Sequence, residues 1–469
     1  MIQTSKVKPA PFPWRDFIRR VALIAVPIAL QNLLTTTGSM VDTMMIASLG
    51  NTQVGAVGLC AQFSSLMFSS YWGFVGGGML FFAQYWGAKD DDGINRAYGL
   101  TMTCMMTVGL LFCVLATCFP GTVMRLYTDK PAIQAVGVEY LRIAGFSYPL
   151  MVFSMGMAAL LRCTDRVRLP LYGSLSGVAV NILLNWVLIF GHLGLPALGV
   201  RGAAIATVVA QCVSIAVVIV LARRSGHRYL LAFAQHFRWN RELIRSYFTK
   251  CFPILCNEAL IGVGNMVINV VLGRQPEEAI AALAVFRTLE GLVIGFFAGF
   301  SSAASVLVGT LVGAGDPDTA FKRAWRLVYL CQGFIGVVCA LMTALHGPIL
   351  NMMGMHGESF RIGFGLIAIY AVAAVIRMGN WTMNDTFRAA GDATTGTVME
   401  IAFMWAMLLP LVWLSGMVWH WPTLAVFACC YIDEPIRYLL MQRHLFSGKW
   451  IRPVTAEGKA ALAGWKPDR

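Results

Sequence analysis

Long apolar runs, separated by short charged or turn-rich breaks, recur along the whole chain and constrain its fold more than any other feature. A membrane-spanning helix needs about 20 apolar residues, so roughly 240 would supply about twelve spans. Of the 469 residues, 58% are apolar and only 13% are charged, against about 25% charged in soluble proteins. We therefore predict an all-α integral membrane protein with twelve transmembrane helices, at residues 21–46, 54–86, 97–119, 137–161, 171–193, 201–222, 251–273, 280–312, 327–346, 362–387, 394–417 and 423–441.

Basic residues gather on one side of these predicted spans. The N-terminal segment, every second loop and the C-terminal tail hold 27 of the 36 Lys and Arg residues, while the opposite loops hold five. The positive-inside rule then predicts a cell-membrane protein with both termini cytoplasmic. The net charge of +13 reflects this orientation, and we expect no nucleic-acid partner. The predicted units are a cytoplasmic segment 1–20, a first lobe 21–222, a basic linker 223–250, a second lobe 251–441 and a cytoplasmic tail 442–469.

The two halves of the chain form an internal repeat. A constant shift of 226 residues aligns them without a gap, placing Pro27 on Pro253 and Arg162 on Arg388. Each half holds six predicted spans, an even number, so both halves begin on the same face of the membrane. This pattern predicts a parallel repeat of two six-helix lobes, related by a pseudo-twofold axis along the membrane normal and typical of alternating-access carriers.

Several motifs, in order over nearly the whole chain, resemble the multidrug and toxic compound extrusion (MATE) family. The resemblance implies a secondary antiporter that expels small organic, often cationic and amphipathic compounds in exchange for Na⁺ or H⁺. It also places the family's first-lobe cation site on four residues, Asp42, Asn181, Asn185 and Thr207. The motifs include Asp42-Thr43-Met44-Met45, Gly87-Ala88-Lys89, Asn181…Asn185, Pro253…Asn257-Glu258, Arg388-Ala389-Ala390-Gly391-Asp392 and Asp433-Glu434.

The residues themselves also single out Asp42. An ionisable group inside a span is costly unless it is paired, hydrated or protonated, so it marks a functional site by default. Asp42 follows a hydroxyl-rich turn, and Asn181 and Asn185 share one helix face because they lie four residues apart. One carboxylate with neutral amide and hydroxyl oxygens suits a monovalent cation or a proton. The alternative is that the Asn pair only joins neighbouring helices.

The second half is chemically different, because Ile268 stands at the position equivalent to Asp42. It carries Glu258 in its first span, and Arg287 and Glu290 three residues apart on one helix face. We predict a buried network in which Glu258 exchanges the cation or proton, and Arg287 with Glu290 holds it or meets the substrate. A purely structural ion-pair cluster is the alternative. The remaining candidates for this polar network are Arg377, Asp385 and Glu400.

Pro27 removes a backbone hydrogen bond inside the first span and predicts a kink, which either changes with ion load or only serves packing. The twelve cysteines show no metal-ligand spacing and are predicted to be free thiols. No phosphate-cradling or hydrolase motif occurs, so we expect neither an enzyme nor ATP-driven transport, no cofactor beyond the coupling ion, and a monomer. A flippase for lipid-linked sugars is the alternative transporter, and an intramembrane enzyme or scaffold the alternative outside that class.

Overall fold

The computed structural model describes residues 12–467, which form helices joined by short connections. The first eleven residues of the predicted N-terminal segment and the last two of the tail lie outside the described residues. The first half comprises α1 (Trp14–Ala47), α2 (Asn51–Ala88), α3 (Asp91–Cys118), α4 (Pro120–Tyr127), α5 (Pro131–Ala144), α6 (Ser147–Cys163), α7 (Arg168–Phe190) and α8 (Val200–Arg224). The short η1 (Tyr229–Leu231) and α9 (Phe233–His236) follow. The second half comprises α10 (Arg241–Leu272), α11 (Glu277–Gly313), α12 (Pro317–Ala344), α13 (His346–Met352), α14 (Gly357–Ala389), α15 (Thr395–Phe403), the π-helical η2 (Met404–Leu408), α16 (Leu409–Trp413), the π-helical η3 (Leu414–Val418), α17 (Thr423–Cys429), α18 (Glu434–Ser447) and α19 (Ala456–Leu462).

Within the described residues, ten helices are long and apolar enough to cross a membrane, and α5 with α6 forms one further span bent by 50°. The predicted single helix at 137–161 is therefore two helices. The predicted helix at 423–441 is also wrong as one element, because the chain breaks between α17 and α18. Pro435 has no backbone N–H and favours the first turn of a new helix, so α18 begins beside it at Glu434.

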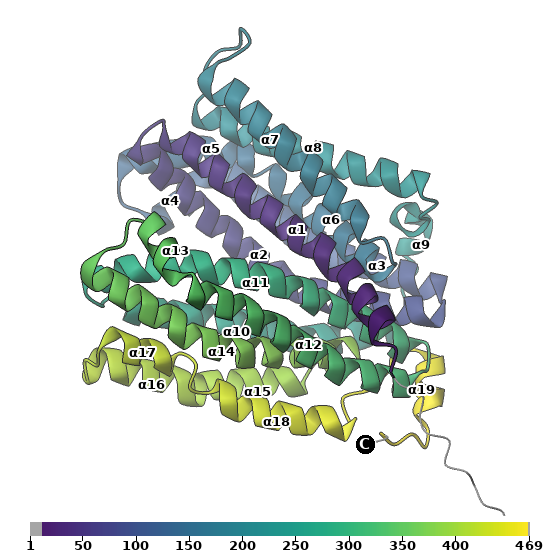
Figure 1. Cartoon of the computed structure of the whole chain (residues 1–469). Coiled ribbons are helices and arrows are strands. Elements are labelled where there is room, and N and C mark those ends of the chain that lie inside the picture. The colour runs from purple at the N-terminus through teal and green to yellow at the C-terminus, as the bar shows by residue number, and fades with distance from the viewer. Residues whose placement is uncertain (1–11, 468–469) are drawn as a thin grey trace, which may run out of the picture.

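The 226-residue repeat is confirmed by the helix bounds. Helices α3 and α12 are offset by 226 residues at both ends, and the pair α5–α6, spanning 131–163, corresponds to α14, spanning 357–389. Figure 1 shows the first half, in purple and blue, on one side of the bundle and the second half, in green and yellow, on the other. The described ends of the chain lie at the same end of the bundle, as expected from the twelve spans predicted from the sequence.

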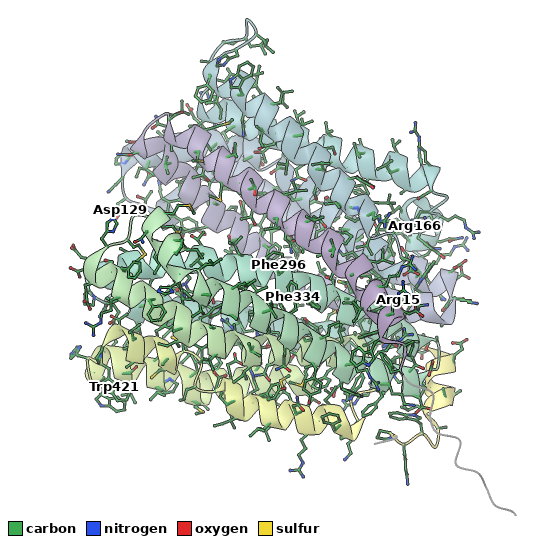
Figure 2. All side chains as sticks on the ribbon, viewed as in Figure 1. Arg15, Asp129, Arg166, Phe296, Phe334 and Trp421 are labelled. Carbon is green, nitrogen blue, oxygen red and sulfur yellow. The ribbon has the colours of Figure 1, made fainter. Side chains whose placement is uncertain are left out.

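Labelled charged residues lie toward both ends of the bundle, and Phe296 and Phe334 lie between them (Figure 2). Arg15 and Arg166 lie at the end nearest the chain termini, and Asp129 and Trp421 lie toward the opposite end (Figure 2). All twelve cysteines are free thiols, as predicted.

The two lobes meet through α1 with α11 and through α2 with both α10 and α11. The closest approaches use small residues. Gly73 of α2 lies against Leu255 of α10, and Gly299 of α11 lies against the backbone of Ala25 of α1. Gly299 is the repeat counterpart of Gly73. These contacts all fall in the half of each helix nearest the chain termini, so the lobes are in contact at that end.

Gln84 joins the two lobes at this end of the bundle, which we call the closed end because the lobes are in contact there. Its side chain is fully buried. Its Nε2 donates to the carbonyl oxygen of Ala389 at 2.9 Å, and its Oε1 accepts from the backbone N–H of Val454 at 2.8 Å. The next residue, Thr455, donates to the carbonyl oxygen of Gly313 at 2.9 Å. The segment after α18 therefore binds both lobes across their shared end.

Candidate functional site

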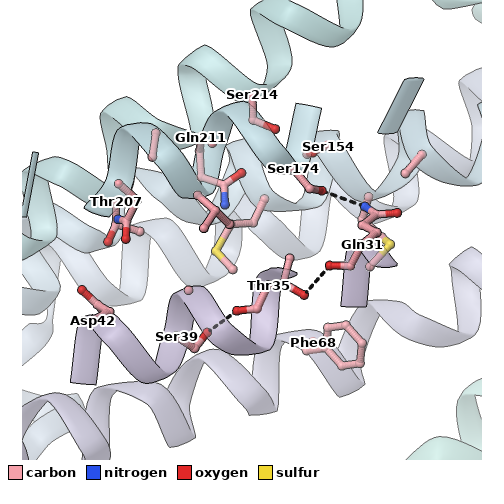
Figure 3. A pocket seen from close by; sticks show the side chains of 18 of the residues that line it. Gln31, Thr35, Ser39, Asp42, Phe68, Ser154, Ser174, Thr207, Gln211 and Ser214 are labelled. Carbon is pink, nitrogen blue, oxygen red and sulfur yellow. Dashed lines mark hydrogen bonds between the residues drawn. The ribbon is translucent and has the colours of Figure 1, made fainter. Parts of the chain in front are cut away.

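A cavity of about 450 Å³ lies inside the first lobe, between α1, α2, α6, α7 and α8. We call it the mid-helix cavity. Figure 3 shows Asp42 near one end of it and Gln31 near the other. Thr35 and Ser39 line it from α1, and their hydroxyls donate to backbone carbonyls on the preceding turn, which satisfies them without another partner. Its remaining polar lining includes Ser154, Ser174, Asn181, Thr207, Gln211 and Ser214.

The structure brings the four predicted first-lobe residues together. The Nδ2 of Asn185 donates to Oδ1 of Asp42 at 2.6 Å and to Oδ1 of Asn181 at 3.2 Å. Thr207 lines the same cavity from α8, and its hydroxyl donates to the carbonyl oxygen of Ala203. Asn185 is fully buried, and its Oδ1 has no hydrogen-bond partner within the described part of the chain.

This donor set fits a hard monovalent cation. It offers one carboxylate, from Asp42, together with amide oxygens from α7 and the hydroxyl of Thr207; such oxygens are the ligands that hard cations prefer. Across residues 12–467, no group of three or more His, Cys, Asp or Glu side chains could hold a metal ion. The site therefore carries too little negative charge for a tightly held divalent ion, but enough for Na⁺ or a proton.

The second lobe holds a chain of ion pairs, most of whose side chains are buried. At one end, Glu290 accepts from Arg287 at 2.8 Å and from Arg377 at 3.1 Å. The Nε of Arg377 lies 3.9 Å from Glu434, and Glu434 accepts from Arg437 at 2.6 Å. The guanidinium of Arg377 also lies over the ring of Trp381, 4.5 Å from its centroid, a favourable cation–π geometry.

The chain of pairs continues to Glu258. Arg437 lies 3.9 Å from Glu400, and Arg388 lies 3.9 Å from both Glu400 and Glu258. Glu400 also accepts from Asn257 at 3.1 Å and from Asn384 at 3.0 Å.

The prediction that Arg287 and Glu290 hold Glu258 is wrong, and the alternative that they meet the substrate stays a prediction. The ion-pair partner of Glu258 is Arg388, whereas Arg287 and Glu290 lie at the opposite end of the chain of pairs. The predicted span 362–387 ends before Arg388, but α14 continues to Ala389, and Arg388 pairs with carboxylates inside the lobe. Arg162 likewise falls just outside its predicted span, 137–161, but lies in the last turn of α6 and is buried. Neither arginine contributes to a loop charge.

Asp385 is the remaining predicted residue of this lobe. It accepts from Ser301 at 2.5 Å and forms no ion pair within the described residues. Sequence reasoning missed Asp433, Glu434 and Arg437 as members of the network. The available signal was the presence of three charged residues within the predicted span 423–441.

A matched pair of polar contacts relates the two lobes. In the first, Gln31 donates to Ser174 at 2.9 Å and accepts from Arg162 at 2.9 Å. The residues 226 positions later are Asn257, which donates to Glu400, and Arg388, which pairs with that same carboxylate. The repeat therefore keeps the contact between corresponding helices but replaces a hydroxyl by a carboxylate. Pro27 lies one turn before Gln31, buried within the continuous helix α1.

The MatE family model matches residues 27–187 and again 253–414. The two matches begin 226 residues apart, the offset of the internal repeat, and together they cover more than half of the chain. The chain belongs to the MATE family. It is therefore a membrane transporter rather than an enzyme.

Similar proteins extend over most of this MATE transporter. It is 25% identical over 408 residues to "Probable multidrug resistance protein YoeA" of Bacillus subtilis, covering 86% of this chain and 87% of that protein. It is 28% identical over 399 residues to "Probable multidrug resistance protein NorM" of Burkholderia pseudomallei, covering 83% and 84%. A solved structure, "Crystal structure of MATE in complex with MaL6", superposes with a TM-score of 0.81 at 15% identity, covering 92% and 96%. This last likeness shows a shared fold.

Proposed function

We propose that this MATE transporter exports small organic, cationic and amphipathic compounds in exchange for Na⁺ or H⁺ by alternating access. The observation that carries the proposal is Asp42, an acidic side chain in a transmembrane helix that lines a cavity large enough for several waters or a small organic molecule. The named relatives are multidrug resistance proteins, which supports organic compounds as the substrates.

Exchange follows from competition for one carboxylate. A bound Na⁺ would take oxygens from Asp42, Asn181 and Thr207, and a proton would take Asp42 alone. Either one removes the negative charge that a cationic substrate needs. Cation arrival therefore favours substrate release, and substrate binding favours cation release, which is the coupling that antiport requires.

The membrane orientation is part of the proposal. With both termini cytoplasmic, the closed end of the bundle is the cytoplasmic end. Met40 and its repeat counterpart Met266 lie toward the other end and are 55% and 68% exposed. We propose that the lobes rock apart at the Gln84 end to admit substrate from the cytoplasm, with the protein working as a monomer.

The second lobe takes a different part in this scheme. Its carboxylates are largely matched by arginines, so a substrate cation would find little uncompensated charge there. Among the paired carboxylates of this network Glu258 is the most exposed, at 23%, and its arginine lies 3.9 Å away. We propose that Glu258 is a second exchange site for the coupling ion, while Arg287, Glu290, Arg377 and Glu400 hold the lobe rigid.

Proteoliposomes with separately imposed Na⁺ and pH gradients test the proposal. Ethidium should accumulate on the side from which the coupling cation enters, under one gradient or both, and Asp42→Asn should reduce the initial rate at least tenfold with normal protein yield. Absence of organic-cation transport under both gradients would contradict the proposed function. Wild-type rates in Asp42→Asn would contradict the assigned site.

A further inference from the structure

A second cavity of about 330 Å³ adjoins Asp42 on its other side. It lies between α1, α2, α5, α6 and α8, and we call it the hairpin cavity because it extends toward the turn that joins α1 to α2. Along α1 it runs from Ser39 to Ile46, next to the helix end at Ala47. The mid-helix cavity instead extends from Asp42 toward Gln31.

The two cavities share four lining residues, Ser39, Asp42, Met151 and Thr207. The carboxylate of Asp42 can therefore be approached from two directions, one along α1 toward the α1–α2 turn and one toward the middle of the lobe. A single cavity would force the ion and the substrate to follow one another through the same space. Two cavities that meet at Asp42 remove that constraint.

The hairpin cavity has a mostly apolar wall that carries several hydroxyl groups. Hydroxyl groups of Thr43, Ser64, Tyr140 and Tyr148 line it, and Ser64 donates to the phenol oxygen of Tyr148 at 3.2 Å. Holding one water takes at least about 10–15 Å³ of cavity, so the space suffices for several hydrogen-bonded waters. Aliphatic side chains, including Val54 and Val57 near the α1–α2 turn, make up much of the remaining wall.

The mid-helix cavity has the features that an organic substrate needs. It is larger, and it combines the amides of Gln31 and Gln211 with the aromatic ring of Phe68 and the thioether of Met155. Adaptable methionine and aromatic surfaces suit varied organic cations. Among the described residues that line either cavity, the titratable groups besides Asp42 are the phenols of Tyr71, Tyr140 and Tyr148.

We propose that the hairpin cavity is a dedicated passage for the coupling cation or proton to Asp42, separate from the mid-helix cavity that holds the organic substrate. This inference rests on the proposed function and adds to it the route by which the coupling ion reaches Asp42. It explains how an ion can displace a bound substrate: the ion reaches the shared carboxylate from the side that the substrate does not occupy.

Gly58 allows the passage to be narrowed selectively. It lines the hairpin cavity from α2, and a Cβ built there meets nothing within 4 Å. Gly58→Leu places an isobutyl group in the cavity without a backbone clash. Ser154→Leu adds bulk to the wall of the mid-helix cavity. Gly333→Leu on α12 is the control, because Gly333 also has open space and lines neither cavity.

The experiment uses purified full-length protein with bound ethidium. Equilibrium binding gives the ethidium Kd, and stopped-flow mixing with Na⁺ or acid gives the rate of cation-triggered ethidium release. Gly58→Leu should slow release at least tenfold and leave the Kd within twofold of wild type. Ser154→Leu should raise the Kd at least tenfold with an unchanged cation midpoint, and Gly333→Leu should change neither. Ala61→Met, in the same wall as Gly58, is a second variant should Gly58→Leu fail to fold.

The possible failures are distinguishable. If Asp42→Asn abolishes cation-triggered release while Gly58→Leu and Ala61→Met retain the wild-type rate, the exchange site stands and the separate passage is refuted. The passage is equally refuted if these two variants raise the ethidium Kd as much as Ser154→Leu does. If Asp42→Asn itself releases ethidium at the wild-type rate, the proposed function fails at its exchange site.

Discussion

Gly87 of α2 and Gly313 of α11 lie 226 positions apart and make the same contact from opposite lobes. A Cβ on Gly87 would overlap the carbonyl oxygen of Thr310, and one on Gly313 would overlap that of Gln84. Thr310 and Gln84 are themselves repeat counterparts. The closed end of the transporter is therefore a pseudo-symmetric helix crossing in which two backbones touch, and only glycine leaves room for this.

Adding a methyl group at this crossing should weaken the closed state. Gly87→Ala or Gly313→Ala should cost about 1–3 kcal/mol, the usual cost of overpacking, and should lower the thermal unfolding midpoint in detergent. Gly121→Ala on α4 is the control, since a Cβ there meets nothing within 4 Å. A midpoint in both crossing variants as high as in Gly121→Ala would show that the lobes do not meet as described.

Gln84→Leu should open the same end by a different means. The substitution leaves the carbonyl oxygen of Ala389 and the N–H of Val454 without partners, at a cost of about 1–3 kcal/mol for each buried group. Cys251, fully buried between the lobes against Gly77, should then react faster with a maleimide, as read by mass spectrometry.

The control for this labelling experiment is Gln442→Leu. Gln442 hydrogen-bonds to Tyr329 and Tyr438, which belong to the same lobe, so its loss should not separate the lobes. Equal labelling of Cys251 in wild type and Gln84→Leu would contradict the role of Gln84 in holding the closed end.

Arg437 is predicted to be the most sensitive member of the second-lobe ion pairs. It is 4% exposed and pairs with Glu434, Glu400 and Asp433. Removing one partner of a buried ion pair typically costs 3–5 kcal/mol, so Arg437→Met should lower the unfolding midpoint strongly or abolish expression. Arg201→Met removes the exposed pair with Glu139 and should leave the midpoint unchanged; comparable losses in the two variants would argue against a buried network.

His227 should make stability depend on pH. It lies between α8 and η1, outside the spans, where burial and the nearby charge of Arg166 lower its pKa from 6.5 to about 4. Between about pH 6.5 and 4 the unfolded chain binds a proton at His227 that the folded protein does not bind. The free energy of unfolding therefore decreases as pH falls from about 6.5 toward 4. His227→Gln should flatten this part of the plot of unfolding midpoint against pH. His356 is exposed, so His356→Gln is the control and should leave the plot unchanged. A plot that His227→Gln does not change would show that another group causes the pH dependence.

The lobes were predictable from sequence because their signals are repetitive. Apolar runs identify spans wherever the whole helix is apolar, and the 226-residue offset identifies the repeat. The helix at 423–441 was not correctly predicted, because a count of apolar residues does not show the break between α17 and α18, where Pro435 begins a new helix.

The first-lobe site was predictable for a related reason. Asp42 is the lone charged residue of the predicted span 21–46, and Asn181 and Asn185 share a face by spacing alone. The partner of Glu258 was not predictable from spacing, because Arg388 lies 130 positions away on another helix. Only the packing of α14 against the neighbouring helices brings the two side chains together.

The most direct test of exchange at Asp42 is counterflow driven by the substrate. Proteoliposomes loaded with ethidium and diluted into ethidium-free buffer should take up Na⁺ or protons as ethidium leaves, measured with a sodium- or pH-sensitive dye in the absence of any imposed cation gradient. The account predicts cation uptake in wild type and its loss in Asp42→Asn. Ethidium efflux from wild type without cation uptake, or undiminished uptake in Asp42→Asn, would contradict it.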